Sequence, residues 1–425
     1  MRWLLVATAL GVCLGQPAAG QSLALELKRF LHDDAAATLH LRSYLFDRRR
    51  PTMPHFASMA GGGWVGLQSG WFYDVLQLGA VGYTTQPIWA PRGPYETSDG
   101  TRLLKRGGYG FFSLGEAYAS VRWSNQVATV YRQRIDELEV NPRDNRMIPN
   151  TFEAYALRGK LGDDFSYFAG YVAAMKPRDE SGFANMAEVA GAPNVNAGML
   201  LGSLKYGDLS KLRLRAAAYV VPDIMWSSYG DAGGTIALTD DLTLRLQGQV
   251  AVQGSTGANL LTGEPFSTFW AGGQADLLWG PLSLRLAYTQ VGTAARWRSP
   301  YGVWIGYNKR QVLDFDRAGE RAWQIGAGYD FAAVGLAGLT LMASATYGDN
   351  ALIPGTGGLL REDWEYNLDL QFRADRLPLP EWLQPLQLRG RAAFIDRYFA
   401  QYVNSYTEYR LILNYELTWK GRGRH

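Results

Sequence analysis

Residues 409–419 read YRLILNYELTW, and every second residue of this stretch is apolar or aromatic. The apolar series begins at Tyr409 and ends at Trp419, and the positions between include Arg410, Glu416 and Thr418. Successive side chains of a β-strand point to opposite faces of its sheet. This period of two therefore predicts a strand with one apolar face and one polar face.

The same period recurs along the chain, at residues 212–220, 242–253, 282–289 and 386–394. Segments of about ten residues with this pattern, separated by turn residues, are typical of transmembrane β-barrels. The strands of a closed barrel satisfy one another's backbone hydrogen bonds, which a span through lipid requires. The pattern therefore predicts an all-β fold, a transmembrane antiparallel β-barrel.

The N-terminus has the features of a secretory signal peptide. Residues 1–3 read MRW and give a basic start, and residues 4–15 form an apolar run that is too short to span a bilayer. Ala18 and Gly20 are small residues of the kind that signal peptidase accepts before its cut. We therefore expect a signal peptide at residues 1–20 and a single barrel domain at residues 21–425.

The composition agrees with this export route. The single cysteine, Cys13, lies in the apolar run, and lipidation there is disfavoured because Val12 is not small. A chain cut after Gly20 has no cysteine and so no disulfide. The formal net charge of +3 gives no indication of nucleic-acid binding. The 49 glycines and the aromatic content of 13% suit a barrel with aromatic girdles at both membrane interfaces.

Two other structures would produce part of this pattern. A soluble β-sandwich also alternates, but the signal peptide, the runs that recur up to the last strand and the aromatics near the run ends favour the barrel. Those aromatics are Trp279, Tyr288, Tyr409 and Trp419. Residues 331–347 are uncharged and long enough for a helix, but Gly335 and Gly338 favour a strand, a tight turn and a second strand.

The breaks between runs fall into two classes. Long polar breaks lie at residues 90–108, 141–150, 176–198, 254–267 and 349–363. Tight breaks lie at residues 162–164, 239–241 and 280–281. Long extracellular loops and short periplasmic turns are the expected asymmetry of an outer-membrane barrel.

If the apolar face contacts lipid, the polar face lines the lumen, and arginine is frequent on it. The arginines expected to point inward are Arg42, Arg213, Arg215, Arg245, Arg285, Arg373, Arg389, Arg391 and Arg410. Inward acids are fewer, with Asp369 and Glu416 the clearest. Arginine is always charged, its planar fork suits carboxylates, and rings of basic residues in a pore favour anions. The pattern predicts a basic track for carboxylate-bearing solutes. The open alternative is that these arginines pair with acids on loops folded into the lumen.

Motifs for catalysis or metal binding are not found in the sequence. None of His32, His40, His55 and His425 is spaced as a metal pair, and there is no G-x-S-x-G elbow or phosphate-binding loop. His40 and Ser43 are neighbours, but the alternation puts them on opposite faces. We therefore expect no enzyme, no catalytic residue, no metal site and no cofactor.

Several segments together resemble the OprD-type porins, which are substrate-selective carboxylate channels of the outer membrane. They are residues 39–48, 144–149, 329–331, 335–340, 362–370 and 408–415, which read LHLRSYLFDR, DNRMIP, YDF, GLAGLT, EDWEYNLDL and EYRLILNY. The resemblance runs from the first strand to the last. It implies about 18 strands, a monomer that often associates as a trimer, a narrow eyelet and a ladder of basic residues.

The resemblance also assigns residues. Ladder positions would be Arg42, Arg389, Arg391 and Arg410, and Asp144 and Arg146 would belong to the loop that constricts the pore. Gln371 is a departure, since an inward arginine would suit the ladder there.

We therefore expect an outer-membrane porin of a Gram-negative bacterium, for passive and selective diffusion of small carboxylate-bearing solutes such as organic acids or amino acids. The pore-lining residues would be Arg42, Arg213, Arg215, Arg245, Arg285, Arg389, Arg391 and Arg410. Expected partners are small solutes, outer-membrane lipid and the barrel assembly machinery, with a monomer or homotrimer and no nucleic acid. One alternative is a channel for neutral solutes such as oligosaccharides, in which Tyr219, Trp297 and Tyr301 would matter more. A barrel enzyme or a structural anchor is less favoured.

Overall fold

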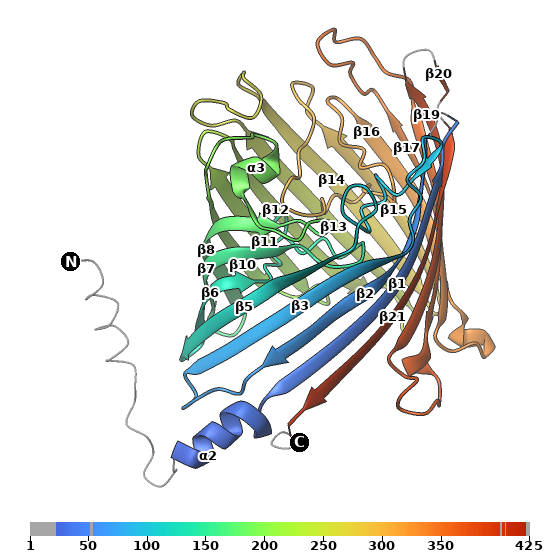
Figure 1. The fold of residues 1–425 in the computed structure, drawn as a ribbon. Coiled ribbons are helices and arrows are strands. Elements are labelled where there is room, and N and C mark those ends of the chain that lie inside the picture. Colours follow the sequence, from blue (N-terminus) through green and yellow to red (C-terminus); the bar gives the residue numbers. More distant parts are fainter. Residues whose placement is uncertain (1–22, 52–53, 400–401, 404, 422–425) are drawn as a thin grey trace.

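The chain folds as a closed antiparallel β-barrel (Figure 1). The computed structural model describes residues 23–51, 54–399, 402–403 and 405–421, so the expected signal peptide and its cut after Gly20 lie outside the described residues. Among these residues eighteen long strands each pair with the next in the chain, and the last pairs with the first. The prediction of an all-β barrel of about eighteen strands is confirmed.

The long strands are β1 (Ala36–Arg49), β2 (His55–Gln68), β3 (Leu76–Trp89), β5 (Phe111–Trp123), β6 (Gln126–Gln133), β7 (Thr151–Leu161), β8 (Phe165–Lys176), β10 (Met199–Gly207), β11 (Leu212–Val221), β12 (Met225–Ala237), β13 (Leu242–Gly254), β14 (Ser267–Trp279), β15 (Leu282–Val291), β16 (Arg321–Asp330), β17 (Leu339–Asp349), β18 (Asp363–Arg373), β19 (Leu386–Phe399) and β21 (Tyr406–Lys420). Three two-residue strands, β4 (Glu96–Thr97), β9 (Ala184–Asn185) and β20 (Tyr402–Val403), lie in loops. The helices are α2 (Leu23–Lys28), a π-helical turn (Arg29–Asp33), α3 (Met186–Ala190) and two 3-10 turns (Phe331–Val334 and Ala374–Arg376).

Pairing of β1 with β21 closes the barrel. Leu41 lies opposite Tyr415 and Arg42 lies opposite Asn414, in a register that continues from Ala36 to Arg49. On its other edge β1 pairs with β2, where Gly63 has φ of +139°. A Cβ atom on Gly63 would collide with the carbonyl oxygen of His40, so a glycine is required at this close approach of two strands.

Helix α2 lies beside the start of β1, at the end of the barrel where the last strand ends (Figure 1). The ring of Phe30, in the π-helical turn, packs against Phe72 with 5.6 Å between ring centroids. Within the described part of the chain, no helix combines the length and the apolar character needed to cross a membrane.

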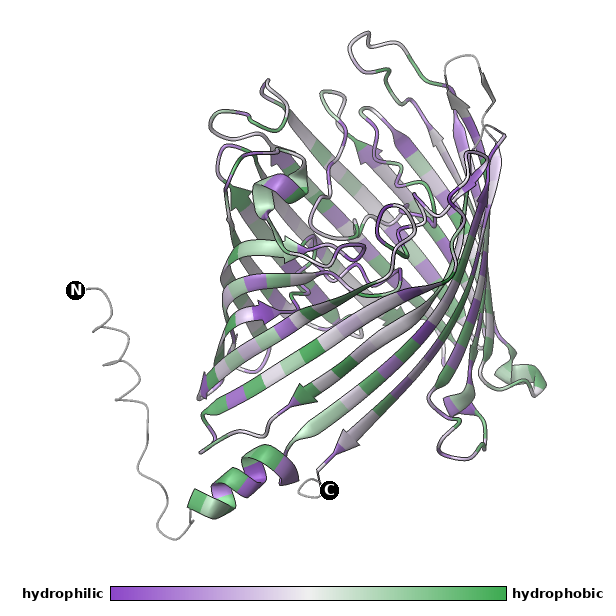
Figure 2. Cartoon of the chain, in the orientation of Figure 1, coloured by the Kyte–Doolittle hydropathy of each residue, from purple (hydrophilic) through white to green (hydrophobic). Residues whose placement is uncertain are grey.

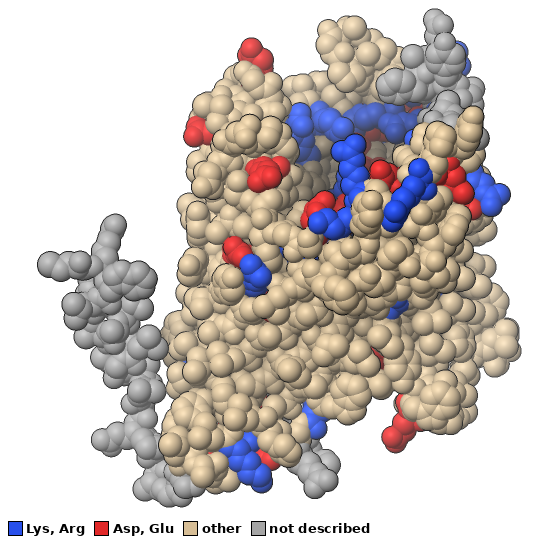
Figure 3. Space-filling view, in the orientation of Figure 1, with Lys and Arg blue, Asp and Glu red and all other residues tan. Residues whose placement is uncertain are grey.

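The two faces of the wall differ as the alternation predicts. Leu246, Leu286 and Leu411 are exposed on the outer face, whereas Arg245 and Arg285 point into the lumen. Hydrophobic and hydrophilic residues accordingly alternate along the strands in Figure 2. In the view of Figure 3, charged residues gather toward the two ends of the outer wall, and the band between them is mostly uncharged. An uncharged band on the outside is what contact with lipid requires.

The connections are mostly long at one end of the barrel and mostly short at the other. All five predicted long breaks lie at the end opposite α2, and the predicted tight turns lie at the end of α2. The longest loop, residues 292–320 between β15 and β16, was not predicted. The prediction of a strand beginning at Phe331 was wrong: Phe331–Val334 form a 3-10 turn that Asp330 caps, and the next strand starts at Leu339.

The hydrophobic core lies inside the barrel, between its inner wall and loops that fold into it. Trp297 and Trp304 of loop 292–320 pack on Trp270 of β14, with centroid separations of 6.3 and 5.0 Å. Leu138 of loop 134–150 belongs to the same cluster. A fully buried large apolar side chain stabilises by roughly 1.5–3 kcal/mol. This packing therefore holds both loops in place and narrows the lumen.

Candidate functional site

A cavity of 320 Å³ lies in the lumen, against the wall formed by β13 to β19 and under loop 292–320. Six basic side chains line it, and two acids lie among them, in the part of the chain that the structure describes. The basic residues are Arg245, Arg285, Lys309, Arg310, Arg389 and Arg391, and the acids are Asp276 and Asp369. An excess of positive charge in a confined space attracts anions.

On one side of the cavity, Asp276 of β14 holds Arg285 of β15. Nε of Arg285 donates to Oδ1 of Asp276 at 2.6 Å, and Nη2 lies 3.3 Å from Oδ2. Arg245 of β13 lies opposite Asp276 in the register, and its Nε is 3.5 Å from the hydroxyl of Thr235. Two arginines therefore share the neighbourhood of one aspartate.

On the other side, Asp369 of β18 holds two arginines of β19. Nε of Arg389 donates to Oδ1 of Asp369 at 2.7 Å, and Nε of Arg391 lies 2.9 Å from Oδ2. The side chain of Arg389 remains 41% exposed, so its guanidinium is accessible from the lumen. This side also has two arginines for one aspartate.

Loop 292–320 brings two further basic side chains over the cavity. Lys309 forms an ion pair with Asp314 of the same loop, and burial lowers the pKa of Lys309 to about 7. The pKa of Arg310 is lowered to about 10, because burial and the charges of Arg285 and Arg391 outweigh the opposing charge of Glu365. Arg310 is therefore still cationic at neutral pH.

The other predicted arginines line other parts of the inner wall. Arg215 donates to Asp231 through Nε and Nη2, at 3.0 and 2.6 Å from Oδ2, and Arg213 lies 3.4 Å from the same carboxylate. Arg42 of β1 donates to Asp144 at 2.5 Å, which ties loop 134–150 to the wall. The resemblance placed Asp144 in a constricting loop, and the structure places it in a loop that enters the lumen.

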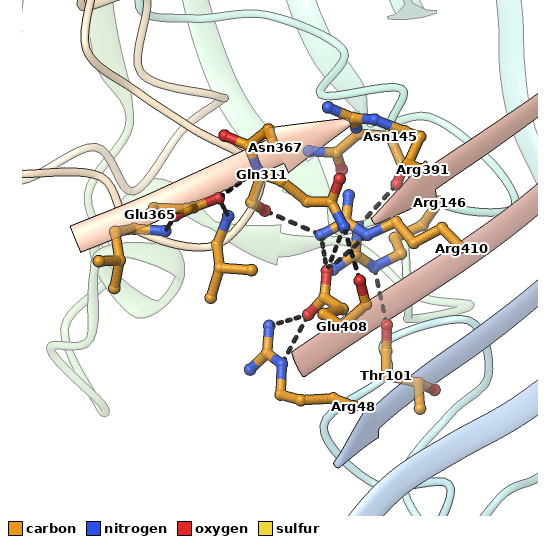
Figure 4. Close-up of polar contacts among 12 residues, drawn as sticks. Arg48, Thr101, Asn145, Arg146, Gln311, Glu365, Asn367, Arg391, Glu408 and Arg410 are labelled. Carbon is orange, nitrogen blue, oxygen red and sulfur yellow. Dashed lines mark hydrogen bonds and ion pairs between the residues drawn. The ribbon is translucent and has the colours of Figure 1, made fainter. Parts of the chain in front are cut away.

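Arg410 and Arg146 are anchors in this structure (Figure 4). Glu408, which is fully buried, accepts from Arg48 and from Arg410 at 2.6 Å each. Arg410 also donates to the carbonyl oxygen of Gln311 at 2.8 Å. Arg146 donates to the carbonyl oxygen of Thr101 at 2.7 Å. These bonds join loop 292–320 to the wall and loop 134–150 to loop 90–110.

The sequence pattern missed several inward acids besides Asp369 and Glu416. Asp231, Asp276 and Glu408 all face inward and each contacts inward arginines. Asp276 lies in STFWAGGQADLLW, where outward glycine and alanine hide the period of two. Most of the acids lie on the wall, and Asp144 is the loop acid that the pairing alternative anticipated. Lys309 and Arg310 were missed because they lie in the loop that the pattern did not reveal.

The aromatic residues considered for neutral solutes are buried in packing. Tyr219 and Tyr301 contact edge to face at 5.4 Å, and the hydroxyl of Tyr301 donates to the carbonyl oxygen of Met186 at 3.1 Å. Trp297 is 1% exposed. These three rings hold loops against the wall and present little surface to the lumen.

Comparisons with known proteins find porins. A family model described as outer membrane porin, OprD family, matches residues 29–419. Among solved structures, Pseudomonas aeruginosa OpdK with vanillate is 22% identical, with a TM-score of 0.77, and 91% of this chain and 99% of that chain are covered. Acinetobacter baumannii OccAB1 is 18% identical, with a TM-score of 0.81 and coverage of 92% and 98%. A BenF-like porin from Pseudomonas fluorescens Pf-5 is 20% identical, with a TM-score of 0.79 and coverage of 91% and 99%.

Comparison with curated proteins gives no match. At these identities the structural likeness establishes the shared barrel fold, and the family model adds a match over nearly the whole chain. The matching family and the similar structures are porins. The chain therefore belongs to the OprD family of outer-membrane porins and resides in the outer membrane of a Gram-negative bacterium.

Proposed function

We propose that this porin selects small solutes that carry a carboxylate and lets them diffuse passively through the arginine-lined lumen. The observation that carries the proposal is the cavity of 320 Å³ with five arginines, one lysine and two acids among its described lining residues. Basic residues that line a pore favour anions over cations. A confined positive site also raises the local concentration of anions, which increases their rate of entry.

The geometry supports a mechanism of exchange. Each Arg–Asp contact is charge-assisted, and an arriving carboxylate offers the same two oxygens to the same planar fork. The solute therefore replaces water and shares the arginines with Asp276 and Asp369. Because the aspartates compete for those arginines, the solute is held weakly enough to leave, as conduction requires. The similar OpdK structure contains vanillate, which is itself a carboxylate.

Six of the eight arginines expected to line the pore divide into two sets. Arg245, Arg285, Arg389 and Arg391 line the cavity and are the proposed binding residues. Arg213 and Arg215 are paired with Asp231 but remain partly exposed, so we assign them a guiding role along the wall. We also propose that lipid covers the apolar outer face and that the barrel assembly machinery inserts the chain, as a monomer or homotrimer.

Flux of two solutes of equal size tests the proposal. Lactate carries a carboxylate, and lactamide carries a neutral amide in its place. Proteoliposomes should take up lactate faster than lactamide, and the Arg285→Gln/Arg389→Gln double variant should reduce lactate flux while lactamide flux stays the same. Equal fluxes of the two solutes through the wild type would contradict carboxylate selection and favour the neutral-solute channel.

A further inference from the structure

The cavity has two cationic ends of the same composition. At one end Asp276 contacts Arg285 and lies opposite Arg245 in the register, and at the other end Asp369 contacts both Arg389 and Arg391. Two arginines and one aspartate sum to a charge of +1 at each end. A solute with a single carboxylate compensates one end only.

The residues that line the wall between the two ends are uncharged, and most of them have short side chains. In the register, Arg285 lies opposite Gly326, Gly326 opposite Ser344, and Ser344 opposite Asn367. From β15 to β19 there are four strand spacings, which correspond to about 19 Å along the wall before the reach of the arginine side chains is subtracted. Gly328 and Met342 also line this stretch, which we call the floor.

Arg310 lies above the floor. It lines the same cavity as Arg285 at one end and Arg391 at the other. Its Nε atom is buried and has no hydrogen-bond partner among the described residues. A solute extended along the floor would therefore pass beneath a third cation between the two ends.

We infer that the cavity binds a dianionic solute, with one carboxylate at each arginine pair and the carbon chain along the floor. The inference rests on the proposed function and names its substrate class. Once one carboxylate is bound, the second is held near its own pair at high effective concentration, so two weak contacts combine. The floor also sets a length, since a short dicarboxylate cannot reach both ends.

Block of the chloride current through single channels tests this inference. The probes are linear dicarboxylates with two to eight methylene groups and the monocarboxylates of the same length. We expect the best dicarboxylate to block at a concentration about tenfold or more below its matched monocarboxylate. Block should be strongest at an intermediate or long chain and weak at the shortest one.

Two variants locate the effect. Arg285→Gln and Arg389→Gln should each abolish the advantage of the dicarboxylate, since each removes one end. Arg376→Gln, in the 3-10 turn at the periplasmic end, is the matched control and should leave the advantage intact. A further variant, Gly326→Val, obstructs the floor without a change of charge. The ideal Cβ of residue 326 would lie 3.5 Å or more from its neighbours, which is ordinary contact, so the barrel should still fold.

The outcomes separate this inference from the proposed function. If monocarboxylates block as well as dicarboxylates of equal length in an anion-selective channel, the dianion site is overturned and carboxylate selection stands. If Gly326→Val keeps the full advantage, the solute does not lie on the floor and the inference fails. If the channel prefers cations and no carboxylate blocks it, the proposed function fails as well.

Discussion

Asp369 of β18 accepts a hydrogen bond of 2.7 Å from Nε of Arg389 on the neighbouring strand. Arg391, two residues along, contacts the other oxygen of the same carboxylate, at 2.9 Å. One acid therefore orients two arginines and neutralises half of their charge. An acid in such a place lowers the affinity for anions and fixes the direction of the donors. The cavity that these residues line is thus basic in sum, and its arginines are locally paired with acids.

The Asp369→Asn variant should make the pore more anion-selective. It removes one negative charge from the cavity while the amide oxygen can still accept from Arg389. One unit charge at about 10 Å in water changes the energy of an ion by about 0.4 kcal/mol, or about twofold in local anion concentration. The ratio of anion to cation permeability in a salt gradient measures this change. Asp375→Asn, at the periplasmic end, is the control, and an unchanged ratio for Asp369→Asn would show that solutes do not pass this cavity.

Glu408→Gln should destabilise the barrel. Glu408 is fully buried between Arg48 of β1 and Arg410 of β21, so the variant leaves two cations without their common partner. Removal of one member of a buried ion pair costs about 3–5 kcal/mol. Guanidinium unfolding followed by tryptophan fluorescence measures the loss. The control is Glu416→Gln, because the side chain of Glu416 is 52% exposed and contacts His40, and a change below about 1 kcal/mol is expected there. Equal effects of the two variants would contradict the anchoring role of Glu408.

Glu139→Gln should change the pH dependence of stability. Glu139 of loop 134–150 is buried and accepts from the hydroxyl of Ser227 at 2.7 Å, and burial raises its pKa to about 7 from an ordinary value of 4.5. The folded protein therefore holds this proton more tightly than the unfolded chain does. Its contribution to stability is complete below pH 4.5 and is lost as the pH rises to 7 and above, by up to about 3 kcal/mol.

Glutamine cannot ionise, so this loss should disappear in the variant. Thermal unfolding at pH 5 and pH 8 provides the measurement. The variant should match the wild type at pH 5 and exceed it at pH 8. If the difference in thermal stability between the wild type and the variant is the same at pH 5 and at pH 8, the carboxylate of Glu139 is not buried in its neutral form.

The fold could be predicted where the outward residues are large. In β13, β15 and β21, outward leucines alternate with inward polar residues, and the period of two is plain. In β12 and β14 the outward positions include Gly230, Ala232, Ala271 and Gly273, which carry no hydrophobic signal. Alternation alone does not reveal these two strands. The number of strands was therefore predicted from the family resemblance.

The site could be predicted only in part. Alternation predicted that Arg285, Arg389 and Arg391 point inward, because the pattern within a single strand determines on which face of the sheet a side chain lies. It gave no register between strands, so it could not bring Asp276 to Arg285. Nor could it place Arg310, whose position depends on how loop 292–320 packs on Trp270. Such packing depends on tertiary contacts, and the alternation within a single strand gives no information about it.

Anion selectivity should depend on the arginines that line the lumen. The direct measurement is the reversal potential across a salt gradient in a planar bilayer, for the wild type and for the Arg389→Gln/Arg391→Gln variant. We expect anion preference in the wild type and a clearly weaker preference in the variant. A wild-type channel that prefers cations, or a variant with an unchanged reversal potential, would contradict this expectation.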